Sequence, residues 1–149
     1  MNSRSTLRWL TGCLLLAFPL PSCPASDRPA PKSNVLLINI DDLGYADIGP
    51  FGSTVNRTPN LDRMAAEGRK LTSFYGAPVC SPSRAALMTG CYPKRALPIP
   101  HVLFPGNAIG LAPAEITVAE VLRSAGYATG LVGKWHLGDQ VEFLPTRQG

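Results

Sequence analysis

The stretch VLLINIDDLG, residues 35 to 44, joins an apolar run to two adjacent carboxylates. Residues 35–40 are rich in leucine and β-branched side chains, a composition typical of a strand that is buried on both faces of a parallel sheet. Asp41 and Asp42 follow the run directly, and Leu43-Gly44 gives the backbone room to turn. The stretch therefore predicts a buried strand with a pair of oxygen ligands at its carboxyl end.

Downstream of this strand, capping residues predict two helices. Thr58-Pro59 supplies an N-cap and a first helical residue, and Gly68 ends that helix. Ser81-Pro82 repeats the start signal, with Gly90 as the corresponding stop. Between the two helices, residues 70–75 alternate well enough to predict a second strand.

The last third of the chain predicts one more helix and one more strand. Thr117 and Glu120 form a capping box for a helix through Ala125, and residues 127–132 are the third predicted strand. The proline-rich residues 93–114 predict an irregular surface loop. This alternation of strands and helices indicates an α/β fold with a mostly parallel sheet.

The three predicted strands lead into polar segments. They are followed by Asp41-Asp42, by the segment that contains Cys80, and by Lys134-Trp135-His136. Ligands of open α/β sheets gather at the carboxyl ends of the strands, so these segments predict one shared site.

The first two of these segments each have an ordinary and a chemical interpretation. Asp41 and Asp42 suit a hard cation such as Ca²⁺ or Mg²⁺, while aspartate is also common in solvated turns. Cys80 lies beside a predicted helix start, where exposed N–H groups favour an anion. Arg84, one turn later, adds a forked cation for a tetrahedral oxyanion, or is an ordinary charge on a helix surface.

The third segment adds a cation and an imidazole. In an extended chain Lys134 and His136 share a face and Trp135 points away. The pair could bind an anion and transfer a proton, or be ordinary surface polarity. Together the predicted groups describe attack on a phosphoryl or sulfuryl centre, and the residues alone do not choose between phosphorus and sulfur.

The amino terminus predicts export. Residues 1–25 combine the basic Arg4 and Arg8 with an apolar segment, 9–20, that is too short to span a bilayer, as in a signal peptide. Residues 26–32 form a Pro-rich tether. The predicted destination is therefore the periplasm or the exterior, with no transmembrane span.

Cys23 offers an alternative to simple secretion. Residues 20–23 read as a lipoprotein box in which Cys23 would carry a lipid anchor, although Pro21 fits that pattern poorly. The net charge is +4 and no dense Lys/Arg patch is present, which argues against nucleic acid as a partner.

Four motifs in order resemble the type I sulfatases, the arylsulfatase family within the alkaline-phosphatase-like superfamily. Residues 80–90, CSPSRAALMTG, match the first sulfatase signature, and residues 126–138 match the second. Residues 41–44 and 58–62 complete the expected series. The resemblance implies that residues 33–149 are the N-terminal portion of a catalytic domain with an α/β/α sandwich, apparently truncated.

The resemblance also implies an unusual nucleophile. In this family the cysteine of Cys-x-Pro-x-Arg is oxidised to Cα-formylglycine by a dedicated maturation enzyme, so Cys80 would become an aldehyde and then a gem-diol. One hydroxyl would attack the sulfur of a sulfate ester, and the second would later release sulfate. Asp41, Asp42 and residue 80 would hold Ca²⁺, with Mg²⁺ as the alternative metal.

The remaining site residues take their roles from the same resemblance. Arg84 would hold the gem-diol, Lys134 would contact sulfate oxygens, and His136 would assist deprotonation. Two rival functions stay open, namely a phosphonate monoester hydrolase or phosphodiesterase of the same superfamily, and an inactive truncated remnant.

Cys91 departs from the family pattern, which often has arginine there. Lys94 and Arg95 are candidates to replace that basic side chain. A disulfide between Cys80 and Cys91 would prevent formylglycine formation, and two cysteines on one short helix make it geometrically awkward.

Overall fold

The computed structural model describes residues 32–149. The predicted signal peptide, 1–25, and residues 26–31 of the tether lie outside the described residues. The chain divides into two compact units, Met1–Ile38 and Asn39–Gly149. In the first unit the described residues 32–38 are exposed and carry no regular secondary structure, whereas the second unit contains every helix of the described chain.

The three predicted strands are not strands of this chain. Residues 35–40, 70–75 and 127–132 have no strand assignment, and neither has any other segment within residues 32–149. A strand needs a neighbouring backbone to pair with, and these runs leave their apolar side chains in solvent, with Leu36 85% and Phe74 74% exposed. Their composition is that of sheet strands, and the missing feature is a paired neighbour.

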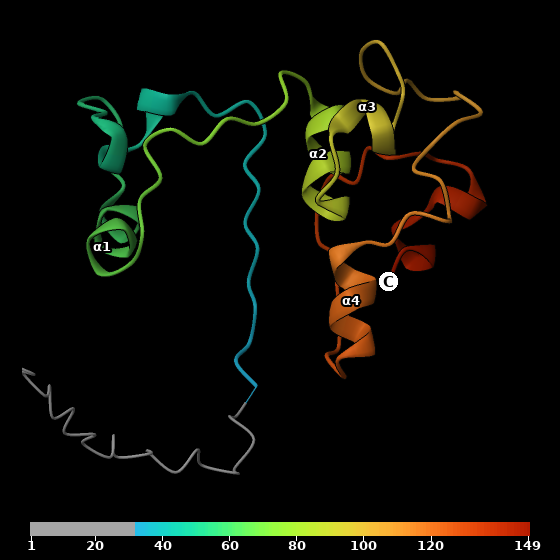
Figure 1. Cartoon of the computed structure of the whole chain (residues 1–149). Helices are drawn as coiled ribbons and strands as arrows, with labels where there is room; N and C mark the ends of the chain where they lie inside the picture. Colours follow the sequence, from blue (N-terminus) through green and yellow to red (C-terminus); the bar gives the residue numbers. More distant parts are fainter. Residues whose placement is uncertain (1–31) are drawn as a thin grey trace, which may run out of the picture. The chain divides into compact units, whose positions relative to one another are not determined.

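The first helical region joins α1, Pro59–Glu67, to two short 3₁₀ helices, η1, Tyr45–Asp47, and η2, Gly49–Phe51 (Figure 1). The predicted bounds of α1 are confirmed, with Thr58 at the N-cap position and the Gly68 N–H donating to the Met64 carbonyl. The Thr58 hydroxyl accepts the N–H of Gly49 at 2.8 Å. It therefore ties α1 to η2 and does not cap its own helix.

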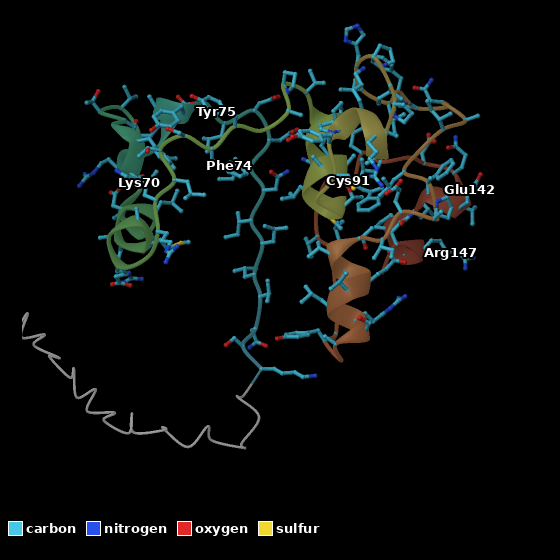
Figure 2. The ribbon with its side chains drawn as sticks, in the orientation of Figure 1. Lys70, Phe74, Tyr75, Cys91, Glu142 and Arg147 are labelled. Carbon is cyan, nitrogen blue, oxygen red and sulfur yellow. The ribbon has the colours of Figure 1, made fainter. Side chains whose placement is uncertain are left out.

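Lys70 contacts η2 in the same region. Lys70, labelled in Figure 2, donates to the Pro50 carbonyl at 2.9 Å, and its ammonium lies 5.7 Å from the centre of the Phe51 ring. The Phe51 ring also contacts Tyr45, with centroids 4.5 Å apart. These contacts anchor the start of the predicted second strand on η2.

Helix α2, Cys80–Thr89, begins earlier than the sequence predicts. Val79 takes the N-cap position, and Ser81 is inside the first turn. Ser81 is wholly buried and its hydroxyl accepts the N–H of Leu103, so it is not available to cap the helix. The predicted stop is confirmed, because Gly90 has a φ of 67° and its N–H donates to the Ala86 carbonyl.

The prediction that residues 93–114 form a surface loop is wrong, because part of this segment is buried. It contains the short helix α3, Pro93–Ala96, which packs on α2, and it supplies most of the buried core. The prolines of this segment break its periodicity, yet several apolar side chains between them join Ala85 of α2 in one buried cluster. The buried apolar residues of the described chain are Ala85, Ala96, Leu97, Ile99, Leu103, Leu111 and Leu137.

Helix α4, Val118–Ser124, confirms the predicted capping box. The Thr117 hydroxyl accepts the Glu120 N–H at 3.2 Å, while the Glu120 carboxylate accepts the Thr117 N–H at 2.8 Å. The same hydroxyl donates to the Gln148 carbonyl at 2.6 Å. Gln148 follows η3, Val141–Phe143, and η4, Pro145–Arg147, so Thr117 joins α4 to the end of the described chain.

Within residues 32–149, no helix is both long and apolar enough to cross a membrane.

Thr117→Ala should lower the free energy of unfolding by about 1–2 kcal/mol, because it removes a capping hydroxyl that also closes a buried hydrogen bond. Thr117→Ser keeps the hydroxyl and should recover most of the loss. Urea denaturation followed by circular dichroism measures both variants. Equal destabilisation by serine and alanine would assign the effect to the lost methyl group and not to the cap.

Candidate active site

Cys80 is the first residue of α2, where the helix presents unpaired main-chain N–H groups. Its side chain is half-buried and its thiol is free, as is that of Cys91. Helix α2 separates the two cysteines, so the disulfide that would block Cys80 does not form. Cys91, labelled in Figure 2, packs against the buried core, and Lys94 donates to the Ile99 carbonyl at 2.6 Å.

Asp41 is the centre of the site. Its carboxylate accepts from the Lys134 ammonium at 2.7 Å and lies 3.4 Å from the Arg84 guanidinium. Arg84 also donates from a second nitrogen to the main-chain carbonyl of Lys134 at 2.5 Å. Three segments that are far apart in sequence are thereby held together by one carboxylate and one forked cation.

A three-residue group beside this ion pair suits a metal ion. Ligand atoms of Asp41, Asp42 and Cys80 all lie within 4.8 Å of one another. The turn that brings both carboxylates together is made by Asp42 itself, at a φ of 55°, and not by Leu43-Gly44 as the sequence predicts. Carboxylate oxygens are the ligands that hard divalent cations prefer, so Asp41 and Asp42 fit Ca²⁺ or Mg²⁺. The Cys80 sulfur is a soft ligand that does not fit these ions, and an oxygen at position 80 would.

The charges of the ion pair support one another. The hydrogen bond from Lys134 lowers the pKa of Asp41, and the Arg84 guanidinium acts in the same direction. In turn the Asp41 carboxylate, and after it the Cys80 thiol, raise the pKa of Lys134. Asp41 and Lys134 are therefore both charged around neutral pH, with the ammonium close to Cys80.

His136 is held separately from this ion pair. Its Nε2 lies 2.7 Å from the Leu103 carbonyl, and its backbone has a left-handed φ of 60° that interrupts the extended alternation predicted for this segment. The neighbouring Trp135 donates to the Phe143 carbonyl at 2.8 Å. Lys134 therefore contacts Asp41, and His136 contacts Leu103. The prediction of a shared face assumes an extended backbone, and the backbone of His136 is not extended.

Sequence reasoning missed Ser81 and Leu103 as parts of this region. Leu103 lies in the segment that was predicted to be a surface loop, and Ser81 was predicted to be a helix cap. The available signal was the apolar spacing within residues 93–114, which places leucine or isoleucine between the prolines.

A family model described as Sulfatase matches residues 33–141. The chain belongs to the sulfatase family. This sulfatase chain is 53% identical to human arylsulfatase A over 120 residues, which cover 78% of the chain and 24% of that protein. It is 48% identical to mouse steryl-sulfatase over 135 residues, covering 87% and 21%.

The similarity extends to human N-acetylgalactosamine-6-sulfatase, at 44% identity over 84% of this chain and 25% of that protein. The sulfatase chain therefore spans about a quarter of the length of the relatives that it matches. All three relatives carry sulfatase names.

Solved structures support the predicted fold. PsFucS1 sulfatase from Pseudoalteromonas sp. superposes with a TM-score of 0.66 at 38% identity, over 74% of this chain and 23% of that one. The structure of Ps i-CgsB gives a TM-score of 0.63 at 40% identity, over 73% and 24%. The predicted α/β, alkaline-phosphatase-like fold class is confirmed by these likenesses.

The Asp41–Lys134 pair predicts a defined pH dependence of stability. Because the folded pKa of Asp41 is lowered, its contribution is present above about pH 4 and is lost as the pH falls through the lowered value. Because the folded pKa of Lys134 is raised, its contribution is present below about pH 10 and is lost as the pH rises through the raised value.

In buffer with a chelator, Asp41→Asn should therefore lower the urea midpoint near neutral pH and have no effect in strong acid. Glu142→Gln, at an exposed position, is the matched control and should leave the midpoint unchanged at every pH. A destabilisation by Asp41→Asn that persists at full size below the lowered pKa would refute the assignment to this ion pair.

Proposed function

We propose that the whole protein hydrolyses sulfate esters with Cys80, converted to Cα-formylglycine, as its nucleophile. The observation that carries this proposal is the placement of Cys80. It is a free, half-buried thiol at the start of α2, within 4.8 Å of ligand atoms of Asp41 and Asp42. Asp41 in turn pairs with the cations Arg84 and Lys134. The sulfatase names of the relatives favour sulfur over phosphorus as the centre of attack.

Maturation supplies the reactive group. The run Cys80-Ser81-Pro82-Ser83-Arg84 has the Cys-x-Pro-x-Arg pattern that a formylglycine-generating enzyme would read before folding is complete. That enzyme is a proposed partner of this chain. Water then adds to the aldehyde at position 80 and gives a carbon that bears two hydroxyls, which makes two successive steps available on one side chain.

In the first step, one hydroxyl of residue 80 loses its proton and attacks the sulfur of the ester. The bond from sulfur to the alcohol oxygen breaks, and the alcohol oxygen takes up a proton in place of the one that residue 80 gives up. The step therefore moves SO₃ from the alcohol to residue 80 with no net change in protons. In the second step, the remaining hydroxyl gives its proton to His136, and its electron pair forms the aldehyde C=O. The bond from carbon to the sulfate oxygen breaks at the same time, and sulfate leaves.

The charged residues hold the participants in place. Arg84 would orient the hydroxyls of residue 80 from one turn along α2, and Lys134 would contact the sulfate oxygens. Asp41, Asp42 and residue 80 would hold the divalent cation, Ca²⁺ or Mg²⁺. When bound, that ion supplies neutralisation of the sulfate charge and favours the ionised hydroxyl.

We also propose an exported protein. Residues 1–25 would direct it to the periplasm or the exterior, and lipidation at Cys23 is the alternative mode of processing.

Cys80→Ala should abolish sulfate ester hydrolysis, whereas Cys91→Ala should retain most of it, because only Cys80 lies in the maturation pattern. Peptide mass spectrometry of the protein matured in a competent host should find the aldehyde or its hydrate at position 80. Full activity with an unmodified thiol would contradict the mechanism.

Asp42→Asn should weaken Ca²⁺ binding to the whole protein by more than the roughly 10–100-fold that the loss of an outer partner of a ligand costs. Glu67→Gln, at the end of α1, should bind Ca²⁺ like the parent protein. Isothermal titration calorimetry reports both affinities independently of turnover. Unchanged affinity in Asp42→Asn would place the metal elsewhere.

A further inference from the structure

A chain of hydrogen bonds joins the residue after the nucleophile to the histidine. Ser81 is wholly buried in the first turn of α2, and its hydroxyl accepts the N–H of Leu103 at 3.1 Å. The carbonyl of the same Leu103 lies 2.7 Å from Nε2 of His136. The main chain of one buried residue therefore connects the two side chains.

The second of these contacts decides where the proton of the imidazole lies. A carbonyl oxygen only accepts hydrogen bonds, so Nε2 of His136 must be the donor in a contact of 2.7 Å. The other ring nitrogen, Nδ1, is buried and has no hydrogen-bond partner among the described residues. In the neutral imidazole, an N–H at Nε2 places the free lone pair on Nδ1.

We propose that Ser81 is a positioning residue that fixes this tautomer of His136 through the backbone of Leu103. The proposal rests on the proposed function and assigns to Nδ1 the role of proton acceptor. In the sulfate-releasing step, Nδ1 takes the proton of the remaining hydroxyl on residue 80. The electron pair of that O–H bond forms the C=O, and the bond to the sulfate oxygen breaks.

Burial makes the position of Leu103 depend on Ser81. Leu103 is 4% exposed, and its N–H donates to the Ser81 hydroxyl. Without that hydroxyl the N–H would be a buried, unpaired donor, and the backbone would shift to find another acceptor. Such a shift moves the carbonyl that holds Nε2, and both the ring orientation and the preference between tautomers change with it.

Nitrogen-15 NMR of the whole protein, labelled at histidine, tests the tautomer directly. The resonances of His136 are identified by their absence in His136→Gln. We expect a protonated Nε2 and an unprotonated Nδ1, and the opposite tautomer would overturn the proposal. This measurement needs no turnover, so it remains decisive even if no sulfate ester is hydrolysed, an outcome that would refute the proposed function alone.

Two substitutions at position 81 test the role of the hydroxyl. Ser81→Ala should populate both tautomers of His136 and lower kcat by about tenfold or more, with KM little changed. This loss of kcat is smaller than the roughly 10²–10⁴-fold that a positioned base contributes. Ser81→Thr, which keeps the hydroxyl, should restore the single tautomer and most of kcat. Ser83→Ala, at the other variable position of the maturation pattern, is the matched control and should behave like the parent.

Mass spectrometry of residue 80 normalises each rate to the matured fraction, which separates a defect in catalysis from a defect in maturation. If Ser81→Ala keeps the single tautomer and the parental kcat, the positioning role is refuted. If Ser81→Ala does not fold, nitrogen-15 NMR of the parent and of Ser81→Thr tests the positioning role instead. A mixed tautomer in the folded Ser81→Thr protein would then refute the proposal.

Discussion

One carboxylate determines how the site is assembled. Asp41 accepts from Lys134 at 2.7 Å and lies 3.4 Å from Arg84, and these residues come from three separate parts of the sequence. Arg84 adds a second bond to the main chain of Lys134, which locks the segment that leads to His136. Both cations of the site are therefore placed with respect to Asp41, whose ligand atom also lies within 4.8 Å of the Cys80 sulfur.

The sequence predicted local features well because they depend on neighbouring residues. The ends of α1, the Gly90 stop and the Thr117–Glu120 capping box are each set by side chains or glycines within a few positions. The closeness of the Asp41 and Asp42 ligand atoms likewise needs only one local turn, whereas their closeness to Cys80 depends on contacts between distant segments. The site residues stay a prediction, drawn from motifs that are short and contiguous.

Features that depend on distant partners could not be predicted in the same way. The strand-like runs 35–40 and 127–132 match sheet strands in composition, but pairing requires a neighbour that local composition does not specify. Conversely, the prolines of residues 93–114 indicated a surface loop, while burial against α2 made this segment the core. Ser81 shows the same limit, because its hydroxyl caps nothing and instead binds Leu103.

In the proposed mechanism residue 80 carries two hydroxyls, one to accept sulfate and one to release it. The C80S variant has a single hydroxyl at this position, so it can be sulfated but has no second hydroxyl with which to expel the group. Mass spectrometry of the variant after incubation with an aryl sulfate distinguishes a residue with one hydroxyl from a residue with two. We expect one sulfate retained on residue 80 without further turnover. Continuous turnover by the variant with no covalent sulfate would rule out the two-hydroxyl mechanism.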